Sequence, residues 1–527
     1  MIIVRDLHLK SESDEPQLIK KAAKRLRLRE GELKGFKIVK RSLDARKKSD
    51  IHWTYSVAFS ADNEADIIKR AGDKSVGKYE ELEYAIPSCP AGAKRPVIVG
   101  FGPAGMFAAL ALSMAGANPI VIERGCEVSR RMELVEAFRS GGRLDPECNV
   151  QFGEGGAGTF SDGKLNTGIK DPRIMFVLRQ FAAHGAPESI VYDAKPHIGT
   201  DILTKVVRSI RQTVIDNGGE VRFESKLTGI KYEKGQLTGI EVETKGGNYT
   251  LDCDALILAI GHSARDTFEM LNAAGVPMTP KAFSIGLRIE HRQSDIDAAQ
   301  YGRAREKLPP ADYALSCHLP DETSAYTFCM CPGGEVIAAA SENGGIVTNG
   351  MSRSKRDGEN ANSALLVTVT PEDFPYDGVL GGMYWQREIE RRAFEVSGSY
   401  RAPAQLAGDF LSGVPSTGAG KVRPSYRPGV HWCDLHDVLP KRITDVLENA
   451  LPELGKKLSG FDEPEAVLTA PETRSSSPVR ILRNSERMSE IRGVFPCGEG
   501  AGYAGGITSA AVDGLKCAEA VMDTLLP

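Results

Sequence analysis

One stretch decides the fold of this chain: residues 95–125, RPVIVGFGPAGMFAALALSMAGANPIVIERG. An apolar run, Val97–Val99, leads into a G-x-G-x-x-G turn at residues 100–105. Small residues with helical character follow, and they predict a helix from Ala104 to about Met114. Strand, glycine turn and helix in this order are typical of a dinucleotide-binding unit.

The second half of this stretch supplies the acid that such a unit needs. An apolar run, Ile120–Ile122, ends on Glu123, which can accept hydrogen bonds from a ribose diol and repel a 2′-phosphate. Gly100 permits the tight turn, Gly102 allows close approach of a pyrophosphate, and Gly105 lets the helix lie against the strands. The free N–H groups of the helix face the phosphates. The alternative is a glycine-rich turn in an ordinary α/β domain, which would not need an acid at this distance.

Length and composition describe a soluble globular protein of several domains. The chain has 527 residues, 41% hydrophobic and 26% charged, which is too long for one core and predicts two to four domains. The first 16 residues lack the apolar core of a signal peptide, and no membrane association is expected. Ten scattered cysteines without C-x-x-C spacing predict reduced thiols and a cytoplasmic location.

Charge is distributed unevenly along the chain. Residues 1–50 carry 15 Lys/Arg and 8 Asp/Glu, a net charge of +7, whereas the remaining residues carry −11. A basic front module on an acidic body suggests a polyanionic partner such as RNA. The alternative is a solvated helix face, since Lys20, Lys21, Lys24 and Arg27 recur at helical spacing.

The front module is predicted to be a small α+β domain. Its expected elements are a helix at Glu15–Leu26 and strands at Ile2–Val4, Lys34–Leu43 and Trp53–Ser60, with a linker at residues 88–92. We divide the chain into a basic N-terminal domain at residues 1–90, the first part of a dinucleotide-binding domain at 94–275, an inserted substrate or cap domain at 276–490, and the C-terminal return of the dinucleotide-binding domain at 491–527.

A second glycine-rich segment, FGEGGAGTFSDGKLN, spans Phe152–Asn166. It matches G-x-G-x-x-G, but no strand ending in an acid follows, so we reject a second dinucleotide unit. We interpret it as a loop laid over a cofactor, with Ser161, Asp162, Lys164 and Asn166 as polar contacts; the alternative is a mobile surface turn. Further on, the apolar run at residues 255–260 enters a turn at Gly261.

The inserted region is predicted to mix strands, turns and two helices. Ala282–Glu290 alternates as a strand, and Leu380–Val396 and Leu439–Leu458 have helical periodicity. Ala325–Cys331 and Glu335–Ala340, joined by Pro-Gly-Gly, are predicted to pair as a hairpin.

The C-terminal segment Gly493–Gly514, GVFPCGEGAGYAGGITSAAVDG, is the second anchor of the fold. A short apolar strand leads to a Gly-Glu-Gly turn, and Gly505-Gly506 opens a helix from Ile507 to about Leu525. This helix start again presents free N–H groups.

In this order the segments resemble the two-dinucleotide-binding flavoprotein superfamily. The motifs SDGKLNTGIKDPR, PHIGTDIL, LAIGHSARDT, APETRSSSPVRI and PCGEGAGYAGGITSAAVDG are more closely similar to a bacterial family of uncharacterised FAD-dependent (NAD/FAD-utilising) dehydrogenases. The resemblance implies an α/β fold: a Rossmann-like FAD-binding domain of the glutathione-reductase-like superfamily, an inserted α+β substrate domain and a small N-terminal α+β domain. Glu499 stands where the superfamily more commonly has Asp.

The resemblance also implies FAD as the cofactor. Its ADP half would lie at the first glycine turn and its flavin near the C-terminal helix start. The predicted cofactor-binding residues are Gly100, Gly102, Pro103, Ala104, Gly105, Glu123, Arg124, Gly156, Ser161, Lys164, Leu227, Gly261, Gly498, Glu499, Gly505, Gly506 and Ile507.

The chemistry expected from such a protein is hydride transfer through the flavin N5, with NAD(P)H as a transient donor. Cys126 and Cys148 lie 22 residues apart and do not form the C-x₄-C pair of disulfide reductases, so no dithiol relay is expected. No metal site is predicted. The catalytic candidates are His262, Lys164, Tyr503 and Arg474, although His262 could cap a turn, Tyr503 could pack on the flavin, and Arg474 could hold an interdomain salt bridge.

Three functions are compatible with these features. The first is an FAD-dependent oxidoreductase acting between NAD(P)H and an unidentified small molecule. The second is a flavin-dependent RNA-modifying enzyme that binds RNA through its basic N-terminal domain. The third is a non-catalytic, flavin-binding regulatory protein.

Overall fold

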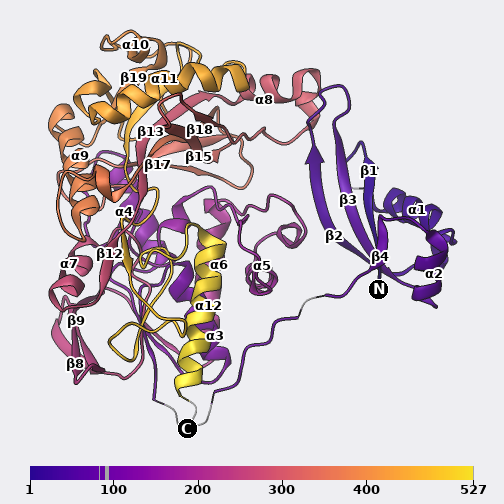
Figure 1. Cartoon of the computed structure of the whole chain (residues 1–527), viewed down its shortest axis with the longest axis horizontal. Coiled ribbons are helices and arrows are strands. Elements are labelled where there is room, and N and C mark those ends of the chain that lie inside the picture. Colours follow the sequence, from indigo (N-terminus) through magenta and orange to yellow (C-terminus); the bar gives the residue numbers. More distant parts are fainter. Residues whose placement is uncertain (13, 82, 90–93, 526–527) are drawn as a thin grey trace.

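A five-stranded parallel sheet forms the centre of the molecule, which is shown as a computed structural model describing residues 1–12, 14–81, 83–89 and 94–525 (Figure 1). The strand order is β23–β11–β5–β6–β7, with β5 next to both β6 and β11. The order reverses at β5, and the crevice at such a point is the usual ligand site of a parallel sheet. The strands are β5 (Val97–Val99), β6 (Ile120–Ile122), β7 (Glu220–Arg222), β11 (Leu256–Leu258) and β23 (Val494–Pro496).

Two helices cross on one face of this sheet. Helix α3 (Pro103–Met114) follows β5, and helix α12 (Ile507–Thr524) closes the chain; they lie side by side in Figure 1. Small residues allow the close approach, since a Cβ on Gly514 of α12 would lie only 2.1 Å from the Ala104 carbonyl oxygen of α3. Helix α3 has no polar face, because the parallel sheet covers one side of it and helices α12 and α6 cover the other. The remaining helices of this region are α4 (Val128–Arg139), α5 (Arg173–Ala183), α6 (Thr200–Asp216) and α7 (Arg265–Ala273).

The predicted fold class is confirmed by these elements. The helix and strands of the first dinucleotide unit have the expected bounds, apart from Pro103, which starts the helix one residue earlier because proline suits the first helical position. A three-stranded antiparallel sheet follows β7 along the chain. It consists of β8 (Ser225–Glu233), β9 (Gln236–Thr244) and β10 (Gly247–Asp252).

A seven-stranded sheet, β14–β15–β18–β13–β21–β19–β20, forms a second layer system with its own apolar core. Helix α11 packs against β13, β14, β15 and β18 of this sheet, and α9 packs against β19 and β21. Its elements are β13 (Phe283–Arg292), α8 (Gln293–Tyr301), β14 (Ser316–His318), β15 (Ser324–Cys331), β18 (Asn360–Val369), α9 (Gly381–Ser397), β19 (Ala402–Leu406), α10 (Ala407–Leu411), β20 (Val430–Trp432), α11 (Lys441–Lys457) and β21 (Val467–Glu472). Two short pairs complete the body: β12 (Met278–Pro280) with β22 (Val479–Ile481), and β16 (Gly334–Ala338) with β17 (Thr348–Ser352).

The predicted hairpin between residues 325–331 and 335–340 is wrong. Strand β15 pairs with β14 and β18, whereas β16 pairs with β17 in a different sheet. The Pro-Gly-Gly turn does redirect the chain, but Gly333 packs against the Arg356 backbone, where a Cβ would lie 1.8 Å from the carbonyl oxygen. The two strands therefore separate, with β15 in the seven-stranded sheet and β16 in a two-stranded pair with β17.

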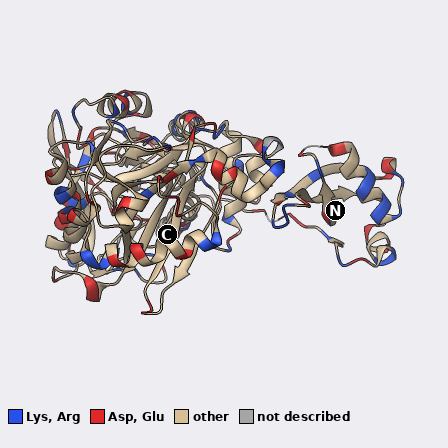
Figure 2. Ribbon diagram, turned by 90° about the horizontal axis from the view of Figure 1, so that it is seen from above, with Lys and Arg blue, Asp and Glu red and all other residues tan. Residues whose placement is uncertain are grey.

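The N-terminal module is a four-stranded sheet, β2–β3–β1–β4, with two helices on one side (Figure 1). Figure 2 shows it projecting from the body, with Lys and Arg on the outer side of α1. The apolar face of α1 covers the sheet and leaves Lys20, Lys21 and Lys24 in solvent. Its elements are β1 (Ile2–Leu9), α1 (Glu15–Leu26), β2 (Lys34–Asp44), β3 (His52–Ser60), α2 (Glu64–Ala71) and β4 (Val76–Lys78); the predicted linker at residues 88–92 lies partly outside the described residues.

Arg41 is central to the contact between this module and the body. Its backbone hydrogen-bonds with Tyr192 and Ala194, and Leu43, Ala45 and Ile51 pack against the core of the seven-stranded sheet. Arg41 donates to both carboxylate oxygens of Asp193 at 2.6 and 3.0 Å and lies over the rings of Trp53 and Tyr192. Among the described helices, none combines the length and apolar character that a membrane crossing requires.

Candidate functional site

A cavity of about 520 Å³ lies at the carboxyl ends of β5 and β11, between the starts of α3 and α12. Its volume is within the range of cofactor and ligand sites. The wall combines glycines from both helix starts, residues of the loop 151–166 and residues of the seven-stranded sheet.

The first helix start is shaped by glycines that no other residue can replace. Gly100 has φ +95°, and a Cβ there would lie 2.4 Å from the Ala259 carbonyl oxygen. Gly105 does not line the cavity: a Cβ there would lie 1.9 Å from the Gly100 carbonyl oxygen, so its role is to hold the helix against the turn. Gly102, Pro103 and the adjacent helix N-terminus line the cavity directly.

Glu123 braces the glycine segments as well as lining the cavity. One carboxylate oxygen accepts the Phe101 N–H at 2.8 Å, and the other accepts the N–H groups of Gly125 and Gly153 at 2.9 Å each. A carboxylate offers about four acceptor positions, so three are already occupied by backbone donors. The predicted hydrogen bond to a ribose therefore depends on the one acceptor position of Glu123 that remains.

The second glycine-rich segment brings the two helix starts together. A Cβ on Gly158 would lie 3.1 Å from Ile507 of α12 and 3.5 Å from Pro103 of α3, and a Cβ on Gly156 would lie 2.8 Å from the Gly102 Cα. The prediction that the two helix starts converge is thus confirmed, and the segment is a loop across them. Both helices direct their N-terminal N–H groups and positive dipole ends at one cavity.

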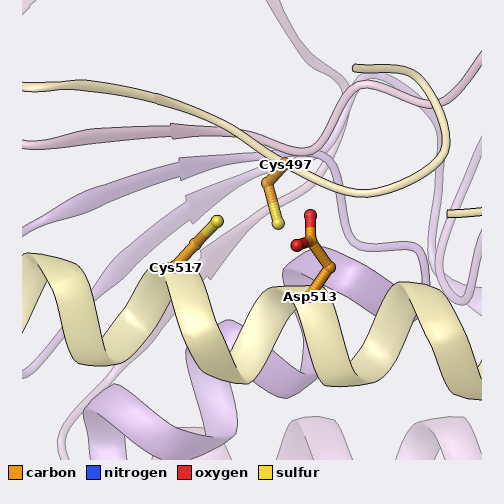
Figure 3. Close-up of side chains that lie close together, drawn as sticks. All are labelled: Cys497, Asp513 and Cys517. Atoms are coloured by element: carbon orange, nitrogen blue, oxygen red, sulfur yellow. The ribbon is translucent and has the colours of Figure 1, made fainter. Parts of the chain in front are cut away.

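A buried acid in α12 stabilises the turn that precedes this helix. Asp513 accepts the Gly498 N–H at 2.8 Å and pairs with Arg483 at 2.7 Å. Cys497 and Cys517 lie beside it, so the three side chains could hold a metal ion by distance alone (Figure 3). The guanidinium already neutralises the carboxylate, so we interpret the cluster as the support of the Gly498 turn.

His262 lines the cavity but is neutral. Burial, followed by the charges of Arg474 and Arg265, lowers the pKa of the imidazole to about 3. Its Nδ1 lies 3.1 Å from the Ser263 hydroxyl and its Nε2 lies 4.0 Å from the Glu499 carboxylate. Burial raises the pKa of Glu499 to about 7. The pair therefore offers one neutral imidazole and one carboxyl group that titrates near neutral pH.

Arg474 reaches the cavity wall with most of its donors already used. It donates to both oxygens of Glu390 at 3.0 and 2.7 Å and to the Ser341 hydroxyl at 2.5 Å. Glu390 also pairs with Arg265, and the two guanidinium groups hold the pKa of this buried carboxyl well below its usual value despite burial. These contacts agree with the alternative interpretation of Arg474, in which it holds a salt bridge between regions of the chain.

Lys164 extends from the loop to the opposite sheet. Its ammonium donates to the Met330 carbonyl and lies 3.8 Å from the buried Asp162, which pairs with Arg356. Ser161 donates to the Gly158 carbonyl at 2.7 Å. Both residues line the cavity, as predicted for cofactor contacts.

Tyr503 lies outside the cavity. The guanidinium of Arg483 stacks 3.7 Å from its ring centre and that of Arg480 lies at 5.2 Å. The ring borders a neighbouring groove that shares Gly505 and Gly506 with the cavity. Arg480 donates to the Gly502 carbonyl and therefore supports the same turn.

Most of the predicted site residues are brought together. Of the 20 different residues, three do not line the cavity: Gly105, Gly498 and Tyr503. The other predicted residues all line it: Gly100, Gly102, Pro103, Ala104, Glu123, Arg124, Gly156, Ser161, Lys164, Leu227, Gly261, His262, Arg474, Glu499, Gly505, Gly506 and Ile507.

Several wall residues were not predicted. Cys329, Asn349 and Glu472 enter from the seven-stranded sheet, and Gln151 precedes the glycine-rich loop. Of these four residues, only Cys329 belongs to a recognisable sequence feature, because a second cysteine, Cys331, lies two residues later. The others lie in strands or turns with no local pattern that marks a site.

The expectation of reduced thiols throughout is wrong at one position. Cys126 and Cys148 form a disulfide, with Cα atoms 5.9 Å apart, behind the wall at Gly125. The remaining cysteines of the described residues are free thiols. Sequence spacing did not reveal the pair because helix α4 and the segment after it separate the two cysteines along the chain.

Comparisons with known proteins agree with a flavoprotein. Residues 282–475 match the family described as FAD-dependent protein, C-terminal domain-like, and residues 1–60 match a domain of unknown function (DUF8436). The first match supports FAD as the cofactor. Fumarate reductase (cytochrome) of Shewanella frigidimarina is 26% identical over 239 residues, covering 41% of this chain and 40% of that enzyme.

Two solved structures match this chain at low TM-scores. Quinol fumarate reductase of E. coli is 13% identical, with 82% of this chain and 70% of that chain covered and a TM-score of 0.38. The flavin-dependent brominase Bmp2 triple mutant is 12% identical, with 81% and 80% covered and a TM-score of 0.37. At these scores neither carries an argument about this chain's activity.

One relative matches from end to end. An uncharacterized protein of Clostridium beijerinckii is 48% identical over 531 residues, covering 99% of this chain and 98% of the relative. The chain, with its two helix starts on one cavity and its FAD-dependent C-terminal match, belongs to the same family as that protein.

Proposed function

We propose that this protein is an FAD-dependent oxidoreductase that passes a hydride between NAD(P)H and a small molecule. One observation carries the proposal: two helix N-termini, more than 400 residues apart in the chain, meet at one cavity of about 520 Å³. Glycines at Gly100, Gly156 and Gly158 keep this cavity open to an extended ligand.

The residues present fit FAD. The α3 start and its glycine turn suit a pyrophosphate, Glu123 suits a ribose, and the start of α12 suits a group that becomes anionic on reduction. Bound FAD would supply the hydride chemistry at its N5. Lys164 and Arg474 would orient an acidic substrate group, and Glu499 could hold a proton near neutral pH.

NAD(P)H is proposed as a transient donor. The described residues contain one parallel dinucleotide unit, so a nicotinamide cofactor would have to dock at the open side of the same cavity. The substrate domain is proposed to be the seven-stranded sheet, which supplies wall residues such as Asn349 and Glu472.

Flavin binding and reduction test this proposal directly. Purified protein incubated with FAD and desalted should stay yellow, and its flavin absorbance should bleach with NADH or NADPH under anaerobic conditions. Protein that retains no FAD would refute the proposal. Retained FAD that neither nucleotide reduces would favour the regulatory, non-catalytic alternative.

A matched pair of variants connects the result to the cavity. Gly156→Val places a side chain 2.8 Å or less from the Gly102 Cα, at a φ of +60°, and should abolish FAD retention. Gly418→Val is the control, because nothing lies within 4 Å of a Cβ there and its φ lies outside the left-handed region that favours glycine. Equal FAD retention by both variants would show that the cofactor binds elsewhere.

A further inference from the structure

Two cysteines on β15 lie at the wall of the cavity. Cys329 lines the cavity and is half-buried, whereas Cys331, two residues later, is fully buried. Both are free thiols. Neither has a part in the proposed binding of FAD, so their position calls for its own explanation.

A β-bulge in β15 contains Cys329 and ends at Cys331. Phe328 pairs with Ala364 and Cys331 with Asn362, so β15 contains one extra residue, and Cys329 has φ +43°. In an extended strand, Cα atoms two residues apart are separated by about 6.6–7 Å, at the outer limit for a disulfide. The two thiols are nevertheless close enough to form a hydrogen bond with each other.

Buried charges hold the bulge in place. Arg288 is fully buried and donates to the Cys329 carbonyl at 2.9 Å while pairing with Glu472 at 3.0 Å. The Cys331 thiol lies 3.2 Å from the same carbonyl. Gly350 leaves room for it, since a Cβ there would lie 2.8 Å from the Cys331 sulfur.

The surroundings shift the pKa values of the two thiols in opposite directions. A hydrogen bond from Cys331 and the positive charges of Arg288 and Lys164 outweigh burial and lower the pKa of Cys329 to about 5. The pKa of Cys331 is raised because of its hydrogen bond with Cys329 and its burial. The charged groups around the pair are Arg288, Lys164, Asp162, Glu472 and Glu499.

We propose that Cys329 and Cys331 are a redox-active pair that carries two electrons between the bound flavin and an organic disulfide substrate. The accessible thiolate beside a buried thiol is the arrangement of an attacking and a resolving cysteine. The inference rests on the proposed function, because the flavin is its source of electrons. The sequence excludes only a dithiol relay of the C-x₄-C type, and the proposed pair does not have that spacing.

The exchange balances in two stages. The Cys329 thiolate attacks one sulfur of the substrate and releases the first thiolate; Cys331, on losing its proton, then attacks Cys329 and releases the second. The two released thiolates take up two protons, one from Cys331 and one from water. The Cys329–Cys331 disulfide then takes a hydride equivalent from reduced flavin, its S–S bond breaks, and it returns to one thiolate and one thiol.

Peptide mass spectrometry tests the pair without relying on flavin. The full-length protein is reduced, freed of reductant, exposed to glutathione disulfide and alkylated with iodoacetamide. The peptide containing Cys329 and Cys331 should lose two hydrogens and carry no alkyl group. Cys433, half-buried and outside the cavity wall, is the internal control and should remain alkylated or unreacted. Alkylation of both cysteines after the oxidant would overturn the proposal.

The pH profile of alkylation adds a readout that mere proximity would not change. A thiolate of low pKa reacts more slowly per ion, so a rate at one pH does not discriminate. The Cys329 rate should stay flat between about pH 6 and 8.5, whereas an ordinary thiol rises about tenfold per pH unit toward its pKa of about 8.5. A Cys329 rate with that ordinary slope would overturn the assignment of Cys329 as the attacking thiol.

Electron counting in the holoprotein tests the link to flavin. After oxidation with glutathione disulfide, anaerobic dithionite titration should consume a second two-electron equivalent beyond the flavin. Cys331→Ala should lose that equivalent and Cys433→Ala should keep it. Equal uptake by wild type and Cys331→Ala would refute the pair even where NAD(P)H bleaches the flavin. A formed disulfide in protein that binds no FAD would refute the proposed function instead.

Discussion

Replacing Gly514 with alanine tests whether the packing of α3 against α12 sets the cofactor site. Gly514 lies in α12 and does not line the cavity, yet a Cβ there would lie 2.1 Å from the Ala104 carbonyl oxygen. Ordinary contacts of a Cβ begin at 3.4 Å, so the helices must separate by about 1.3 Å. The variant therefore changes the distance between the helix starts without removing any group that would touch FAD.

The expected loss follows from that displacement. Overpacking costs about 1–3 kcal/mol of folding free energy. A shift of about 1 Å breaks one hydrogen bond to a charged group at a helix start, worth about 1.5–3 kcal/mol, so FAD should bind about 10- to 100-fold more weakly.

Calorimetric titration of FAD into the apoprotein measures this effect, and circular dichroism at the same temperature verifies that the variant is folded. Gly418→Ala, with open space around its Cβ, is the matched control and should bind as wild type does. An affinity for Gly514→Ala within about twofold of wild type would refute the reasoning that the helix crossing positions the two starts.

Four further predictions use the charges and thiols of the site. Because burial raises the pKa of Glu499 to about 7, the apoprotein should lose stability as pH rises from about 4.5 to 7; Glu499→Gln should therefore be about 3 kcal/mol more stable than wild type in urea at pH 8 and equal to it at pH 4. His262, with a pKa of about 3, should be neutral throughout pH 5–9, so an inflection near pH 6.5 in flavin reduction that vanishes in His262→Asn would contradict this assignment. Reducing Cys126–Cys148, which closes a 22-residue separation, should lower the free energy of unfolding by about 3 kcal/mol, and the double serine variant should not respond to reductant. If residues 1–90 bind RNA, affinity should fall with salt by a log–log slope of several and vanish on their deletion; a flat response would exclude that proposal.

Local signals predicted the elements whose helix starts line the cavity. The bounds of β5 and β6 matched, and helices α3 and α12 agreed to within one residue, because glycine turns, a proline at the first helical position and small-residue periodicity act over a few neighbours. The order of these segments was enough to predict the fold class, and most of the predicted site residues line the cavity.

The amino-acid sequence by itself therefore determined the dinucleotide unit, the C-terminal helix start and the acid at Glu123. Only the tertiary structure decided which strands pair in the larger sheet, that Tyr503 faces a neighbouring groove, and that Cys329 stands between Arg288 and Lys164. The physical reason is range: backbone conformation is set by adjacent residues, whereas strand partners and the charge around a side chain depend on groups from distant parts of the chain.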